Sequence, residues 1–129
     1  NLIKEGNDIT IVAYSNMVNV AKEAIAAEEL QNYSIELIDL QTVSPIDYDT
    51  IKNSLKKTKR LLVCQEAPSN SSVGTTVISK IVESDLFHEL EVAPKLVSGL
   101  HSPMPSAKHL ELNVIPQAED ITNAVKSML

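Results

Sequence analysis

The amino-acid sequence predicts a three-layer α/β/α sandwich built around a mostly parallel sheet. Short, nearly continuous apolar runs rich in β-branched residues recur along the chain, and such runs are typical of strands that are covered on both faces. Segments with apolar residues at helical spacing separate these runs. Consecutive strands joined by helices require parallel pairing, right-handed crossovers and helices on both faces of the sheet.

The first predicted unit is a strand followed by a helix. Residues 1–8 are polar and end in the turn signal Gly6-Asn7-Asp8, and the apolar run 9–14 is the first strand. We expect Ser15 and Asn16 to cap the next helix. The apolar positions of that helix, which recur near helical spacing, are Met17, Val20, Ala21, Ala24 and Leu30.

The second unit repeats this order. Residues 35–40 form the next apolar run, Pro45 breaks the chain, and Asp47 is placed to cap a helix over residues 48–58. Cations are favourable at the C-terminal end of a helix because of the helix dipole. The basic residues gathered there are Lys56, Lys57, Lys59 and Arg60.

The remaining chain predicts two more strands, over residues 61–65 and 95–98, and two more helices. The first of these helices follows a polar loop at 67–72 and carries Val73, Val77, Ile78, Ile81 and Val82. Residues 99–105 are irregular and include two prolines. The last helix follows Pro116, and its apolar face consists of Ala118, Ile121, Val125 and Met128.

Composition limits the classes of function. The chain has 129 residues, a length typical of one domain, and we expect residues 1–129 to form it. A net charge of −6 and the absence of Trp argue against nucleic-acid binding, which needs a basic face and often stacking aromatic residues. No apolar run approaches the length of a membrane span, which is about 18 residues. Cys64 is the only cysteine, which suggests a reducing compartment and a protein that is not secreted.

No self-contained active site is evident in the sequence. Three glycines are too few for a glycine-rich phosphate loop, and the histidines His88, His101 and His109 lack the spacing of metal ligands. We expect Cys64 to be an inert thiol inside a central strand, and we attribute Ser15 to helix capping. We therefore predict no catalytic, cofactor-binding or metal-binding residue, and a domain that supports, assembles or recognises.

Several stretches resemble one family in register over essentially the whole chain. The opening residues 5–14 and the segment Ile38-Asp39-Leu40-Gln41-Thr42-Val43-Ser44-Pro45-Ile46-Asp47 carry most of this resemblance, and the second is similar to the family motif Asp-Leu-Arg-Thr-x-x-Pro-x-Asp. Further matching positions are Lys57-Thr58, Glu66, Gly74, Pro103-Met104-Pro105, Leu110-Glu111 and Ile115-Pro116. The family is that of the C-terminal domains of the β subunits of thiamine-diphosphate-dependent 2-oxoacid dehydrogenases, of the pyruvate and branched-chain type.

The resemblance implies a transketolase C-terminal domain-like fold, with a mixed five-stranded sheet in which one edge strand is antiparallel. The sequence departs from the family pattern at three positions. Gln41 stands where Arg is usual, Ile46 where Trp is common, and His101 where Asp is common. The glycine-rich loop of many relatives is replaced by residues 69–73.

The resemblance also implies a function. The parent enzyme oxidatively decarboxylates pyruvate or a branched-chain 2-oxo acid with thiamine diphosphate and Mg, and transfers the acyl group to lipoamide. Its catalytic residues belong to the preceding domain, so this chain alone is expected to be inactive and to bind no cofactor. The expected partners are the α subunit, a second β subunit and the dihydrolipoyl acyltransferase core, with no nucleic acid and no membrane.

We expect the partner-facing residues to include Glu66, His101, Pro103 and Leu129, although prolines also shape loops without any partner. The expected location is a bacterial cytoplasm or an organelle matrix. Because the chain begins at Asn1, we expect a domain that is excised from a longer subunit or expressed separately. Two alternatives stay open: a stand-alone interaction module of the same fold, and the C-terminal domain of another thiamine enzyme such as transketolase.

Overall fold

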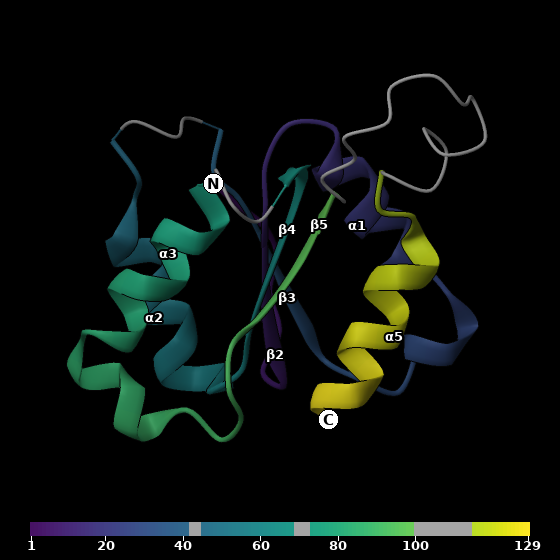
Figure 1. Ribbon diagram of the computed structural model, residues 1–129. Helices are drawn as coiled ribbons and strands as arrows, with labels where there is room; N and C mark the ends of the chain where they lie inside the picture. Colours follow the sequence, from purple (N-terminus) through teal and green to yellow (C-terminus); the bar gives the residue numbers. More distant parts are fainter. Residues whose placement is uncertain (42–44, 69–72, 100–114) are drawn as a thin grey trace.

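Five strands form one sheet, with helices packed on both of its faces (Figure 1). The computed structural model describes residues 1–41, 45–68, 73–99 and 115–129. The strands are β1 (Leu2–Lys4), β2 (Ile9–Ala13), β3 (Ile35–Asp39), β4 (Leu61–Pro68) and β5 (Lys95–Gly99). Their order across the sheet is β1-β3-β2-β4-β5. The helices are α1 (Met17–Ile25), α2 (Tyr48–Thr58), α3 (Val73–Val82) and α5 (Ala118–Met128), with short 3-10 turns η1 (Glu28–Leu30) and η2 (Asp85–Glu89).

The pairing of the strands confirms the predicted fold class. Strands β3, β2, β4 and β5 run parallel, and β1 pairs with β3 in the antiparallel direction at the edge. The residue pattern of 1–8 predicts a polar segment and does not predict β1. All three residues of β1 are exposed, so the strand shows no burial pattern that a sequence could reveal.

Alternating side chains of the strands feed two aliphatic cores. Ile9, Ile11 and Ala13 of β2 pack with α1 and α5, and Val12 packs on the other side with α2 and α3. Every residue of β2 is buried, because helices cover both faces and strands cover both edges. None of the helices in the described ranges is long and apolar enough to span a membrane.

The predicted helix starts are right at one position and wrong at another. Asp47 caps α2 as expected, and its carboxylate accepts a 3.2 Å hydrogen bond from the Thr50 backbone N. Neither Ser15 nor Asn16 caps α1 with its side chain. Instead Ser15 adopts a left-handed conformation with φ 58°, and its carbonyl accepts from the Val18 backbone N at 3.2 Å.

The helix predicted to carry Leu30 ends earlier than expected. Helix α1 stops at Ile25, and Ala27 has extended backbone with ψ 142° before η1 begins. The Gln31 side-chain amide donates to the carbonyls of Ala26 and Ala27, both at 3.1 Å. In a longer helix these carbonyls would accept hydrogen bonds from backbone N–H groups, and here they accept from the Gln31 amide instead. Leu30 therefore reaches the core from η1 and not from α1.

Gly6 provides a close approach between the β1–β2 connection and strand β3. A Cβ at Gly6 would lie 2.5 Å from the Glu36 backbone N and 2.6 Å from the Ile35 carbonyl oxygen. These atoms belong to the backbone of a strand that is paired within the sheet, so they cannot move away from an added Cβ. The connection is therefore restricted to glycine by space.

We predict that Gly6→Ala destabilises the fold by about 1–3 kcal/mol or more, as overpacking against a fixed neighbour does. Gly74→Ala is the matched control. Its Cβ would meet the far ends of the Gln65 and Leu96 side chains, which move more easily than the backbone atoms that face Gly6. Urea denaturation should therefore show the larger loss for Gly6→Ala. Equal stability of Gly6→Ala and the wild type would contradict this packing argument.

Candidate functional site

The carboxyl ends of β2 and β4 lie where the strand order reverses, which is where open α/β sheets bind ligands. From β2 the chain passes through α1 to β3 on one side, and then returns through α2 to β4 on the other side. Helices α1 and α2 cover opposite faces (Figure 1). Tyr14 and Ser15 directly follow β2, and Gln65 and Glu66 lie in the second half of β4.

Gln65 and Gly74 close the space between β4 and the start of α3. The Gln65 side chain is buried, and its Oε1 accepts a 2.7 Å hydrogen bond from the Gly74 backbone N. A Cβ on Gly74 would collide with that same Oε1 and with Leu96. The absence of a side chain at Gly74 therefore leaves room for the Gln65 and Leu96 side chains.

Tyr14 and Ser15 do not form a catalytic pair. Burial, and then the negative charge of Glu66, raise the pKa of the Tyr14 phenol, so the phenol stays protonated at neutral pH. Ser15 is exposed, and within the described part of the chain no side chain hydrogen-bonds to its hydroxyl as a general base would. The attribution of Ser15 to helix capping is wrong, because its side chain does not cap α1.

Cys64 lies in β4 and is fully buried, as its place in the sequence predicts. Burial raises the pKa of the Cys64 thiol, which keeps the sulfur protonated and unreactive. Among the described residues, no group of three or more His, Cys, Asp or Glu side chains is placed to hold a metal ion. His101 and His109 lie outside the described residues.

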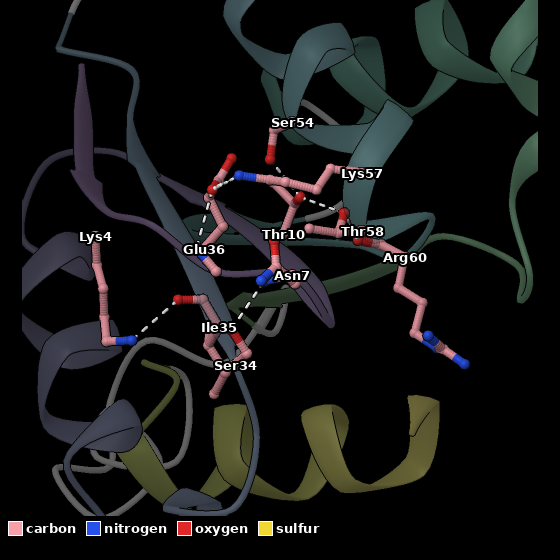
Figure 2. Close-up of polar contacts among 11 residues, drawn as sticks. Lys4, Asn7, Thr10, Ser34, Ile35, Glu36, Ser54, Lys57, Thr58 and Arg60 are labelled. Carbon is pink, nitrogen blue, oxygen red and sulfur yellow. Dashed lines mark hydrogen bonds and ion pairs between the residues drawn. The ribbon is translucent and has the colours of Figure 1, made fainter.

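The buried polar side chains are concentrated near the amino ends of β2 and β3 (Figure 2). The Thr10 hydroxyl is 2.6 Å from the hydroxyls of both Ser54 and Thr58, which come from α2. Glu36 of β3 is 3% exposed, and its Oε1 accepts from Lys57 Nζ at 2.6 Å and from the Gly6 backbone N at 3.0 Å. This network joins β2, β3, α2 and the β1–β2 connection.

The charge on Glu36 is held by its partners. Burial alone would raise the pKa of this carboxyl, but hydrogen bonds from Lys57, Ser54 and the Gly6 backbone outweigh burial and lower the pKa. Lys57 reaches Glu36 from the last turn of α2, with 42% of its side chain exposed. These contacts join Glu36 to α2 and to the β1–β2 connection, so we interpret the arrangement as structural.

At the amino ends of the strands, opposite to Glu66, Arg60 binds the C-terminal end of α5. Its Nε donates to the Met128 carbonyl at 2.9 Å, and its Nη2 donates to Glu91 at 2.8 Å. Its Nη1 reaches the Asp8 carbonyl at 3.4 Å. Arg60 comes just before β4, so the C-terminal end of α5 is fixed at the amino edge of the sheet.

The structure separates two of the residues expected to face partners. Leu129 follows Met128 at the amino edge and is 38% exposed, while Glu66 lies near the carboxyl end of β4 and is partly exposed. From Leu61 to Glu66 a strand rises about 17 Å, at about 3.3 Å per residue. Glu66 and Leu129 therefore do not belong to one small contact. His101 and Pro103 lie outside the described residues.

Neither the hydrogen bonds around Glu36 nor the contacts of Arg60 with Met128, Asp8 and Glu91 are predicted by the sequence. A weak signal for the first exists, since Glu36 interrupts an otherwise apolar run in β3. A charged residue inside a strand that is covered on both faces needs a partner. In the sequence, Lys57 and Arg60 lie at the C-terminal end of a helix, where the helix dipole already explains the presence of cations. Their contacts with distant residues were therefore not expected.

The comparisons with known proteins agree with this architecture. The chain matches the family described as "Transketolase, C-terminal domain" over residues 1–121. It is 39% identical over 127 residues to the pyruvate dehydrogenase E1 component subunit beta of Rickettsia bellii, covering 98% of this chain and 39% of that protein. It is 37% identical over 123 residues to the mitochondrial subunit beta-1 of Oryza sativa, covering 95% of this chain and 33% of that protein.

A solved structure gives the same fold. The chain titled "Split gene transketolase, inactive beta4 tetramer" matches 100% of this chain and 41% of its own length, with a TM-score of 0.78 and 25% sequence identity. The present chain thus spans about a third to two fifths of the length of the proteins that it matches.

We predict that Glu36→Gln lowers stability at neutral pH by about 1–3 kcal/mol, the range for a lost hydrogen bond to a charged group. The pKa of Glu36 is lower in the folded state than its ordinary value of 4.5. Its stabilising effect is therefore complete above that value and is lost as the pH falls through the lower folded pKa.

Urea denaturation between pH 7 and pH 3 measures this effect. The wild type and Glu36→Gln should differ most at neutral pH and converge in acid. Asp47→Asn is a control that compares an exposed carboxylate with the buried one of Glu36. Hydrogen bonds from Thr50 also lower the pKa of Asp47, but Asp47 is fully exposed. A gap between wild type and Glu36→Gln that stays constant down to pH 3 would show that the carboxylate charge does not stabilise the fold.

Proposed function

Since the chain belongs to the transketolase C-terminal domain family, we propose that it is the C-terminal domain of the β subunit of a pyruvate dehydrogenase E1 component. One observation carries the proposal: similarity to such a subunit extends over 98% of this chain at 39% identity. The parent enzyme would decarboxylate a 2-oxo acid and pass the acyl group to lipoamide. Pyruvate is favoured over branched-chain substrates because both curated relatives described above are pyruvate dehydrogenase subunits.

The described residues do not fit thiamine diphosphate. Within the described ranges no group of three or more His, Cys, Asp or Glu side chains is placed to hold its Mg²⁺, and the buried Gln65 amide oxygen is already bound to the Gly74 backbone N. In the proposal, the cofactor and the catalytic residues belong to other domains of the parent enzyme, where the cofactor would supply the carbanion chemistry.

The role proposed for this domain is assembly and docking. Its partners would be the α subunit, a second β subunit and the dihydrolipoyl acyltransferase core. Glu66, His101, Pro103 and Leu129 are the proposed partner-facing residues. The separation of Glu66 from Leu129 supports two different partners at the two edges of the sheet. The compartment proposed is a bacterial cytoplasm or an organelle matrix, in line with a relative that is named mitochondrial.

One specific observation favours transketolase as the parent enzyme. The solved structure of similar fold is a transketolase chain, and its title describes a tetramer of one kind of subunit. That likeness rests on 25% identity, against 39% for the pyruvate dehydrogenase subunit. The dehydrogenase is therefore the favoured parent.

We predict that Leu129→Ser in the assembled enzyme weakens binding to the acyltransferase core about tenfold, which corresponds to about 1.4 kcal/mol for one interface leucine. The reason is that Leu129 is 38% exposed, while the helix that carries it is held by Arg60. Decarboxylation with an artificial electron acceptor should be unchanged, since that reaction does not need the core. Surface plasmon resonance with immobilised acyltransferase measures the affinity.

The matched control is Val82→Ser, because Val82 is also 38% exposed but lies on α3 on the other face of the sheet. Glu66→Gln tests the opposite edge. If Glu66→Gln is the only substitution that weakens binding to the acyltransferase, the contact lies at the carboxyl ends of the strands. If none of the three substitutions changes the affinity, acyltransferase docking through these residues is wrong.

A further inference from the structure

A partly apolar hollow lies beside the edge strand β1. It has a volume of about 630 Å³ and lies between β1 and the C-terminal half of α1. The residues that line it are Ile3, Lys4, Lys22, Ile25, Ala26, Gln31 and Leu37. We call Ile3, Lys4, Lys22 and Ile25 the β1 surface. Ile3 is 37% exposed and its neighbour Leu2 is 42% exposed, so the first strand presents apolar area to solvent.

We propose that the β1 surface is the interdomain face of this protein, and that it packs against the domain preceding it in the longer polypeptide. This inference rests on the proposed function, in which this chain is the C-terminal part of a β subunit. It adds the particular surface through which the domain is attached, which neither the fold nor the comparisons identify.

The geometry of β1 argues against a partner that adds another strand. The β1–β3 register shifts between Leu2 and Lys4, which bends the edge strand. Lys4 lies on this strand, and its Nζ reaches the Ile35 carbonyl at 3.3 Å (Figure 2). Bends and lysines are devices that keep an edge from pairing with another strand. Contact through side chains is left as the means of docking here.

The chemistry of the β1 surface defines what it fits. Its centre is aliphatic, from Ile3 and Ile25 with Leu37 beneath, and its rim carries the ammonium groups of Lys4 and Lys22. In the described part of the chain, neither lysine forms an ion pair. The whole chain has a net charge of −6, so two lysines around one hollow with no carboxylate paired to them in the described residues stand out. A complementary face would be apolar with one or more carboxylates at its margin.

The preceding domain is the occupant that chain connectivity favours. The β1 surface is carried by the first strand, so a domain attached ahead of Asn1 would be tethered within a few residues of it. Tethering gives a neighbouring domain a high effective concentration, on the order of millimolar for a short linker. The matched relatives also contain roughly three fifths of their length or more outside the matched region, which is enough for such a domain.

Amine acetylation by sulfo-N-hydroxysuccinimide acetate tests the proposal. The rate at each lysine is followed by mass spectrometry in the 129-residue chain and in the polypeptide encoded by the complete reading frame. We expect Lys4 and Lys22 to react about tenfold more slowly in the longer polypeptide, the factor for a docked state populated about nine-tenths of the time. Lys56 of α2 and Lys80 of α3 are exposed on the other face and should react at equal rates in both.

The outcomes separate this inference from the proposed function. A reading frame without a preceding domain overturns both. A preceding domain with unchanged rates at Lys4 and Lys22 overturns the docking surface alone. Slowing that appears only after the α subunit is added makes that subunit the occupant, and slowing that depends on the concentration of the 129-residue chain makes a second copy the occupant. Either of these results contradicts the proposal.

Discussion

The position of β2 at the centre of a parallel sheet is the constraint on which the rest of this structure depends. It pairs in parallel with β3 and β4 and has helices on both faces, so none of its five residues reaches solvent. Such a strand is built from aliphatic residues, and its one hydroxyl, on Thr10, needs the two hydroxyls that α2 supplies. Any chemistry or recognition must therefore lie at the strand ends, on the outer helix faces or at the sheet edges.

The sequence predicted most elements because the core of this fold is periodic. The buried runs of β2 and β3, the Asp47 cap and the apolar face of α5 all follow from local pattern. Local pattern fails where tertiary contacts decide. All three residues of β1 are exposed and show no periodicity, Ser15 takes a left-handed conformation where capping was expected, and the Gln31 side chain binds carbonyls just after the end of α1.

The candidate site was predictable only in part, for the same reason. The sequence predicted that Glu66 follows a strand, whereas it lies within β4, and it placed Leu129 directly after a helix; only the topology shows that the two lie at opposite ends of the strands. The ion pair between Glu36 and Lys57 joins residues 21 positions apart, and no local rule pairs them. What emerges is a domain whose buried polar groups are used for its own cohesion, and whose exposed features, at β1 and at the end of α5, suit contacts with other chains or domains.

The central claim is that this domain assembles its parent enzyme and performs no catalysis itself. Native mass spectrometry tests it most directly, with the α subunit mixed with the β polypeptide that either contains or lacks residues 1–129. Circular dichroism first establishes that the truncated polypeptide is folded. We expect a heterotetramer for the complete β polypeptide and no heterotetramer for the truncated one. A truncated polypeptide that forms the same heterotetramer would contradict it.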